Sequence, residues 1–211
     1  YWNDPVWMQF GNSGLKPEKA VSYDIGLERK LSENSTARVS YFASTITDLI
    51  LWDWKSSTLE TRAKNVGEAY SEGIEFEFVR KMGDSGKGFV NYTYQKATDR
   101  NDIDPLAVGK AIRYTPQTKY SAGIVLGESS LIVRHVGERY ADQYNTVQLP
   151  AYTVADLKLA KKIRGATLEL SVNNLLDEQY SEAVGNDPTT FAARKYPMPG
   201  RRCSLGVKWE F

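Results

Sequence analysis

The sequence has little of what most soluble enzymes use for chemistry. Among its 211 residues there is a single cysteine, Cys203, and a single histidine, His135. One cysteine excludes an internal disulfide, and one histidine excludes a histidine cluster for zinc or iron and argues against a Ser-His-Asp catalytic set. His135 follows Arg134 in an expected strand and is interpreted as a wall residue, and Cys203 as an inert residue on an apolar line. The sequence therefore gives no basis for a metal site.

Long apolar runs and an excess of one charge are also missing. No stretch approaches the roughly 18 apolar residues of a membrane-spanning helix. No stretch carries the capped i, i+3, i+4, i+7 stripe of an amphipathic helix. Lysine plus arginine number 27 against 26 acidic residues, so there is no electrostatic case for nucleic acid as a partner.

What the chain has instead is strict alternation of apolar and polar residues, the pattern of strands with two different faces. From Cys203 onward an apolar line runs through Trp209 to Phe211, and a small or polar line runs between its members. The same pattern occurs within residues 21–27, 37–43, 74–78 and 90–94. An apolar strand with an aromatic end tends to aggregate when it is left in water. Two environments accommodate such a strand: the inside of a soluble sheet, or a membrane barrel with lipid outside and water inside.

The connections between the expected strands, about nine in number, alternate in length. Short polar turns are expected near residues 32–36, 82–88, 127–130 and 161–165, and long connections near residues 52–66, 99–116, 140–151 and 173–199. Short turns at one end and long loops at the other are typical of an up-and-down outer-membrane barrel. Charges on the polar lines, such as Glu75, Glu77 and Asp156, suit a wet lumen better than a dry core. The sequence thus predicts an all-β, antiparallel transmembrane barrel segment.

Four strings in order resemble one protein family. They are GLKPEKAVSYDIGLE (residues 14–28), NVGEAYSEGIEFEF (65–78), LPAYTVADLKLAKKI with LELSVNNLLDEQYSE (149–182), and YPMPGR before the last strand. These are similar to segments of TonB-dependent outer-membrane receptors, of the siderophore and cobalamin receptor type. The resemblance covers nearly the whole chain, from about Gly14 to Phe211.

The resemblance implies a 22-stranded barrel with an N-terminal plug in its lumen. Residues 1–17 are then expected to be an extracellular loop, and residues 18–211 the C-terminal part of the barrel, without the plug. The implied function is active import of a ferric siderophore or cobalamin-like ligand across the bacterial outer membrane, and not catalysis. The implied partners are the inner-membrane TonB complex, outer-membrane lipid and lipopolysaccharide, and the barrel-assembly machinery, for which Trp209 and Phe211 resemble the signal. No cofactor is expected.

Aromatic and cationic residues in the loops are the candidates for ligand contact, because they suit an aromatic, anionic ligand through stacking and cation–π contact. The candidates are Trp2, Trp7, Trp52, Trp54, Tyr140, Tyr144, Arg194 and Tyr196. An interfacial aromatic belt uses the same residue types for anchoring and is the alternative interpretation of each.

Three other functions remain open from the residues alone. A passive porin-like or adhesin-type barrel would lack energy coupling, and a soluble β-sandwich binding module would bury the apolar line in a second sheet. A membrane-barrel hydrolase would need an activated serine or paired acids with histidine. The pair Glu75 and Glu77 has no activating neighbour, and the acidic string 99–104 lacks the glycine and distal glutamate of a calcium loop.

Overall fold

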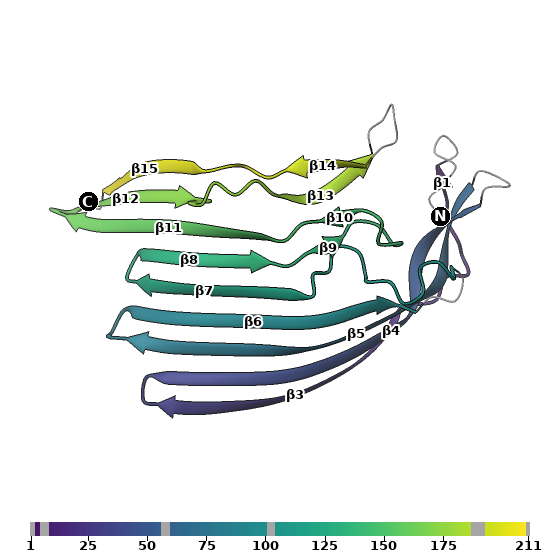
Figure 1. Cartoon of the computed structure of the whole chain (residues 1–211), viewed down its shortest axis with the longest axis horizontal. Helices are drawn as coiled ribbons and strands as arrows, with labels where there is room; N and C mark the ends of the chain where they lie inside the picture. Colours follow the sequence, from purple (N-terminus) through teal and green to yellow (C-terminus); the bar gives the residue numbers. More distant parts are fainter. Residues whose placement is uncertain (1–2, 5–8, 56–59, 101–103, 187–192, 210–211) are drawn as a thin grey trace.

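The computed structural model describes residues 3–4, 9–55, 60–100, 104–186 and 193–209. They form one large sheet and two small hairpins (Figure 1). Nine long strands of the large sheet pair in chain order, each antiparallel to its neighbour. They are β3 (Lys19–Ser32), β4 (Ser35–Lys55), β5 (Glu60–Met82), β6 (Gly86–Asp99), β7 (Thr118–Leu126), β8 (Ser129–Val136), β11 (Tyr152–Ile163), β12 (Ala166–Asn173) and β15 (Arg202–Trp209). The predicted all-β, up-and-down order is confirmed.

The opening segment is not entirely a loop, contrary to the prediction for residues 1–17. It contains β1 (Asn3–Asp4) and β2 (Gln9–Phe10), which pair with each other. Strand β2 then lies parallel to β5, with Gln9 opposite Thr61. Two-residue strands carry no alternation, so the sequence pattern could not reveal them.

The continuous register gives the sheet two distinct faces. One cross-strand row contains Leu27, Val39, Phe76, Tyr92, Tyr120 and His135; the next contains Glu28, Arg38, Glu77, Asn91, Ser121 and Arg134. Because successive side chains of a strand point to opposite sides, these rows belong to opposite faces. We call them the apolar face and the polar face. On the apolar face His135 stacks on Tyr120 at a ring distance of 4.5 Å, which agrees with its interpretation as a wall residue.

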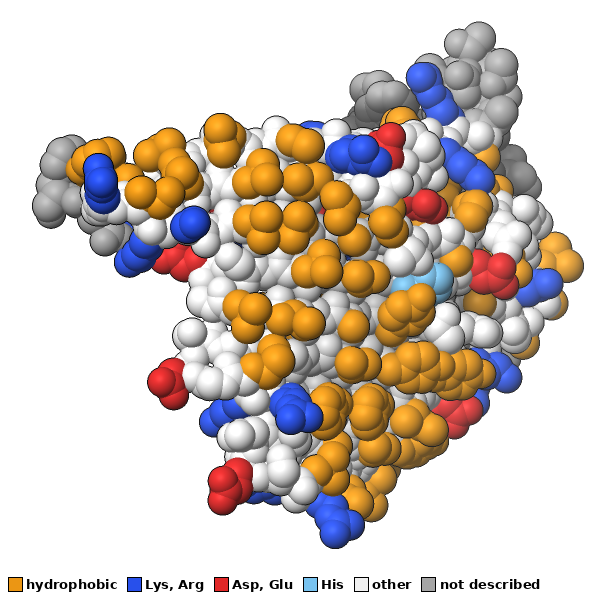
Figure 2. Space-filling view, turned by 60° about the vertical axis from the view of Figure 1, so that its left-hand side comes forward, with side chains coloured by type: hydrophobic (Ala, Val, Ile, Leu, Met, Phe, Trp, Pro, Cys, Tyr) orange, Lys and Arg blue, Asp and Glu red, His pale blue; other side chains and the backbone are white. Residues whose placement is uncertain are grey.

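The apolar face is exposed. Its side chains include Ile25, 72% exposed, and Leu205, 79% exposed. Figure 2 shows hydrophobic side chains gathered over the middle of one side of the molecule, with most charged side chains toward its margins. Within the described residues no second sheet covers this face, as the β-sandwich alternative would require. The described chain contains no helix that is long and apolar enough to cross a membrane.

The connections are sorted by end, as the sequence predicted. The turns β3–β4, β5–β6, β7–β8 and β11–β12 are short and lie at the same end as the C-terminus (Figure 1). Glycines with left-handed φ angles, Gly83, Gly127 and Gly165, form three of these turns. A residue with a Cβ atom would be strained in that conformation. The other end carries the long connections.

The expected loop at residues 52–66 is wrong. Strand β4 continues to Lys55 and β5 starts at Glu60, so Trp52 and Trp54 belong to a strand rather than to the loop. Strand β6 ends at Asp99, opposite Ala69, and beyond that point β5 pairs with β4 and briefly with β2. Beyond a lipid layer both faces of a strand meet water, so the apolar alternation that marks a strand disappears.

Two phenylalanines on the polar face cover glycines of the neighbouring strand. Phe42 lies opposite Gly73, and Phe89 lies opposite Gly123. A Cβ atom on Gly73 would lie 2.6 Å from the Phe42 ring, and one on Gly123 would lie 2.7 Å from the Phe89 ring. The missing side chains therefore provide the space that the two rings occupy.

Candidate functional site

Three connections meet at the end of the sheet opposite the short turns. We call them connection A (residues 100–117), connection B (137–151) and connection C (174–201). Connection B contains the hairpin of β9 (Arg139–Tyr140) and β10 (Gln148–Leu149), and connection C contains that of β13 (Ser181–Asn186) and β14 (Ala193–Pro197). These hairpins correct the expectation of plain loops at Tyr140 and at Arg194 and Tyr196. Strands β9 and β10 are too short to show a period-2 pattern, and the residues of β13 and β14 do not alternate between apolar and polar.

Connections A and B are joined by hydrogen bonds. The Asn145 side chain accepts from the amide of Ala111 at 2.8 Å and donates to the carbonyl of Ala111 at 2.9 Å. Asp104 accepts from the Tyr144 hydroxyl at 2.9 Å and from the Gln143 amide at 3.0 Å. The hydrogen bond that the Tyr144 hydroxyl donates to Asp104 raises the pKa of Tyr144 above its ordinary value. These hydrogen bonds therefore hold connections A and B together.

The turn at residues 142–147 is organised by a single carboxylate. Asp142 accepts hydrogen bonds from the amides of Tyr144, Thr146 and Val147, and from the Thr146 hydroxyl. Partial burial works to raise the pKa of Asp142, but these donors outweigh it and hold the pKa below its usual value. The turn thus keeps Asp142 ionised.

Connection B also contacts connection C through a buried cation. Arg139 is 5% exposed and donates through Nη2 to the carbonyl of Ser181 at 3.1 Å. Its guanidinium lies 5.4 Å from the ring of Tyr152, which stacks on Tyr180 at 4.1 Å. Its Nη1 has no hydrogen-bond partner in the described part of the chain. Contact with an aromatic face partly compensates a guanidinium for lost water.

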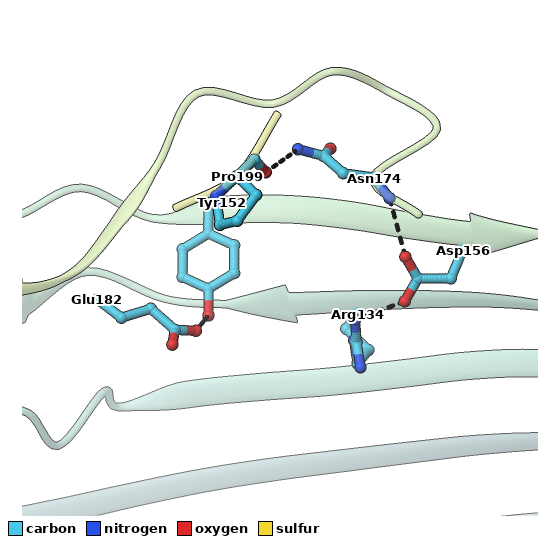
Figure 3. Close-up of polar contacts among 6 residues, drawn as sticks. All are labelled: Arg134, Tyr152, Asp156, Asn174, Glu182 and Pro199. Atoms are coloured by element: carbon cyan, nitrogen blue, oxygen red, sulfur yellow. Dashed lines mark hydrogen bonds and ion pairs between the residues drawn. The ribbon is translucent and has the colours of Figure 1, made fainter. Parts of the chain in front are cut away.

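The base of connection C is fixed to the polar face of the sheet (Figure 3). Asp156 of β11 accepts from Arg134 at 2.6 Å and from the backbone amide of Asn174 at 2.9 Å. The Asn174 side chain donates to the carbonyl of Pro199 at 3.3 Å, just before β15. Asp177 accepts from the backbone amide of Arg201 at 2.8 Å. The two ends of connection C are thereby held together.

A second contact in the same view holds the hairpin of connection C. The Tyr152 hydroxyl donates to Glu182 at 2.6 Å (Figure 3). Tyr152 belongs to β11 and Glu182 to β13, so this bond joins the wall of the sheet to the connection above it. The connection is therefore anchored at its base and again along its length.

The polar face carries a cleft nearer the short turns. It has a volume of about 400 Å³ and is lined by Arg38, Ser40, Glu75, Phe76, Glu77, Asn91, Tyr92 and Thr93. Glu75 and Glu77 share this cleft with Arg38, which lies opposite Glu77 in the register. No histidine is among the residues that line the cleft. We therefore interpret the cleft as part of a water-exposed wall of the sheet.

The predicted ligand residues are distributed unevenly. Tyr140 and Tyr144 lie in connection B, and Arg194 and Tyr196 lie on β14 in connection C, where Tyr196 is 53% exposed. Trp52 and Trp54 lie on β4, beyond the end of β6; their side chains, and the residues Trp2, Trp7 and Phe211, lie outside what the structure describes. Trp209 is 60% exposed and is the last residue of β15, on its apolar face.

Several residues that hold this end together were missed at the level of sequence. They are Tyr114, Arg139, Asp142, Asn145 and Tyr152. The string DQYN (142–145) could have indicated the turn at this place, because aspartate caps turns and asparagine tolerates positive φ angles. Nothing in the sequence indicated that Arg139 is buried.

A family model matches most of this chain, in agreement with the sorted connections and the exposed apolar face. The β-barrel model of the TonB dependent receptor-like family matches residues 1–175. The chain belongs to the TonB-dependent receptor-like β-barrel family. Among curated proteins, the ferrioxamine receptor of Yersinia enterocolitica is 26% identical over 80% of this chain and 25% of its own length. The vitamin B12 transporter BtuB of Vibrio vulnificus is 28% identical over 100% of this chain and 33% of its own.

Solved structures of this family share the fold. The ferric yersiniabactin uptake receptor FyuA from Yersinia pestis superposes with a TM-score of 0.76 at 19% identity, over 92% of this chain and 30% of that protein. The copper transporter OprC gives a TM-score of 0.70 at 23% identity, over 95% of this chain and 34% of that protein. The chain thus spans about a quarter to a third of the length of these proteins. Its sheet is a segment of a larger transmembrane barrel.

Proposed function

We propose that this chain forms part of an outer-membrane receptor that captures a ferric siderophore or cobalamin-like ligand at the end bearing connections A, B and C. Import of the ligand is driven by the inner-membrane TonB complex. The observation that carries the proposal is the combination, in one family-matched sheet, of an exposed apolar face with joined connections at one end. Relatives named for ferrioxamine and for vitamin B12 supply the two ligand classes.

The membrane placement has a direct test. Leu205 and Ser204 are neighbours on β15, and the register puts Leu205 on the apolar face beside Leu170 and Ser204 on the polar face beside Ser171. If lipid covers the apolar face, Leu205→Arg destabilises the folded barrel by about 2 to 4 kcal/mol, the cost of a cation facing the bilayer centre. Ser204→Arg is the matched control and costs much less. Equal costs for the two variants would contradict lipid contact.

Transport is tested with the complete receptor that contains this chain. Uptake of radiolabelled ferrioxamine B and of vitamin B12 is measured separately in cells that carry the receptor and lack their own receptors for these ligands. We expect uptake of one of them to depend on TonB. Uptake that continues in cells without TonB would favour the passive-barrel alternative, because a passive pore needs no energy coupling.

Two further partners belong to the proposal. Trp209 ends β15 on the apolar face, and with Phe211 it resembles the signal recognised by the barrel-assembly machinery. Arginines and lysines at the long-connection end suit the phosphates of lipopolysaccharide through charge-assisted hydrogen bonds. Phe211→Ala is expected to accumulate unfolded, while Phe211→Tyr, which keeps the aromatic ring, is expected to assemble.

A further inference from the structure

Tyr114 contacts both of the other connections from its place in connection A. Its backbone amide donates to the carbonyl of Tyr140 in connection B at 2.6 Å. Its side-chain hydroxyl lies 3.3 Å from the carbonyl and 3.4 Å from the amide of Val184 on β13 in connection C. One hydroxyl can donate to the carbonyl and accept from the amide at once. Tyr114 therefore joins connection A to B through its backbone and to C through its side chain.

The backbone of Tyr114 is in an unfavourable conformation. Its φ angle is 59°, in the left-handed region that glycine and asparagine adopt readily and tyrosine rarely does. Such a residue persists where its surroundings fix it, and strained residues of this kind gather at ligand clamps and switches. In this case the surroundings are the two contacts just described, one on each side of the residue.

The element that Tyr114 holds carries two candidate ligand residues. Val184 pairs with Lys195 across the β13–β14 hairpin, and the next pair along is Gly185 with Arg194. Tyr196 packs over Gly185, where an added Cβ atom would lie within 3.0 Å of the Tyr196 ring. Fixing Val184 therefore fixes the strand pair on which Arg194 and Tyr196 stand.

We propose that Tyr114 is a positioning residue for ligand capture: its hydroxyl holds the β13–β14 hairpin against connections A and B, so that Arg194 and Tyr196 are in place before the ligand arrives. This rests on the proposed function. A surface that is ordered in advance loses less conformational entropy on binding, and the gain is in affinity rather than in later steps. The hydroxyl is the part of Tyr114 that acts on the hairpin.

The test compares Tyr114→Phe with Tyr23→Phe in the complete receptor. The first variant removes one hydroxyl and leaves the ring and the backbone bond to Tyr140. The second removes a hydroxyl from the apolar face, where Tyr23 is 71% exposed. Hydrogen exchange of the peptide covering Val184 reports the contact directly, because the Val184 amide is one of its partners. Loss of the two bonds should speed that exchange by roughly five- to tenfold.

Uptake of ferrioxamine B and of vitamin B12 by the same variants gives the second readout. For the ligand that the wild-type receptor imports, Tyr114→Phe should raise the half-saturating concentration several-fold and leave the maximal rate unchanged. Tyr23→Phe should change neither quantity. A change in the maximal rate alone, with half-saturation intact, would point to a step after capture and would overturn the proposal.

The two readouts separate the possible failures. Unchanged exchange at Val184 in Tyr114→Phe overturns the proposal, whatever uptake shows. Faster exchange with unchanged half-saturation also overturns it, since the hairpin would then be held by Tyr114 without serving the ligand. If the wild-type receptor imports neither ligand, the proposed function fails for both, and direct binding of each to detergent-solubilised receptor then decides whether Tyr114 affects capture.

Discussion

The side chain of Asn145 pairs with the backbone of Ala111 in the way that one strand residue pairs with another. It accepts from the Ala111 amide at 2.8 Å and donates to the Ala111 carbonyl at 2.9 Å. Ala111 also bridges to Thr98 on its other side. Connection A is thereby held between the end of β6 and connection B, and its position depends on one amide group of the neighbouring connection.

Replacing Asn145 should therefore release connection A. Asn145 has a φ angle of 59°, so Asn145→Gly removes the amide group without adding backbone strain. Two neutral hydrogen bonds contribute roughly 1 to 3 kcal/mol to local stability, and we expect exchange of the Ala111 amide to rise accordingly. Asn145→Ala adds strain at the same φ and should have the larger effect. If Ala111 stays as protected in Asn145→Gly as in the wild type, the paired amide is not what holds connection A.

Asp156 should contribute more to stability than a surface ion pair of similar length. Removing its carboxylate in Asp156→Ala leaves both Arg134 and the Asn174 amide without this partner, and we expect a loss of about 1 to 3 kcal/mol. The control is Glu169→Ala, which removes a 2.9 Å pair with Lys158 whose two side chains are each 41% exposed. Arg134 is 55% exposed, so the expected difference comes from the additional bond of Asp156 to the Asn174 amide. An exposed pair contributes at most about 1 kcal/mol. Urea unfolding of the complete receptor in detergent compares them, and the reverse order would contradict this account.

Glycines of the sheet should differ sharply in their tolerance of a methyl group. An added Cβ atom on Gly73 lies 2.3 Å from the carbonyl oxygen of Tyr94 and 2.6 Å from Phe42, whereas one on Gly206 has nothing within 4 Å. Overpacking of this kind costs about 1 to 3 kcal/mol. Thermal unfolding should therefore show a clear destabilisation for Gly73→Ala and almost none for Gly206→Ala. Matching melting temperatures for the two variants would show that both the Tyr94 backbone and the Phe42 ring move away without cost.

The turn of connection B should lose stability in acid. The pKa of Asp142 is lowered in the folded turn, so its contribution is fully present above the unfolded pKa, ordinarily about 3.9. It is lost as the pH falls through the lower, folded value. The ratio of exchange rates between Asp142→Asn and wild type at residues 144–147 cancels the intrinsic pH dependence. We expect a large ratio at pH 6 that declines toward one below pH of about 4; a ratio independent of pH would exclude the carboxylate as the cause.

The sequence was sufficient where one face of a strand meets an apolar environment. Within residues 19–32 and 202–209 the alternation predicted both the strand and which side chains lie on each face. The reason is that an apolar environment on one side and a polar one on the other select different residues at successive positions. The same physics explains the failure at Trp52 and Trp54. Where both faces are wet, nothing selects one residue class over the other, and the strand has no period.

The candidate site was predicted by residue type and not by arrangement. Tyr144 and Tyr196 were singled out as aromatics in loops, and the structure places them in two different connections that Tyr114 brings together. These contacts join residues separated by 70 positions in one case, from Tyr114 to Val184. No local pattern records a partner so distant, and tyrosine with a positive φ angle is contrary to ordinary preference.

The length of β4 and β5 carries these two strands far beyond a lipid layer. At about 3.3 Å per residue, 21 and 23 residues reach some 70 Å, more than twice the roughly 30 Å of hydrocarbon in a bilayer. Beyond Ala69 the pair is no longer bonded to β6 and is bordered by the two-residue strand β2. In an outer membrane this extension of β4 and β5 would lie in the water beyond the lipid, where large molecules can reach it.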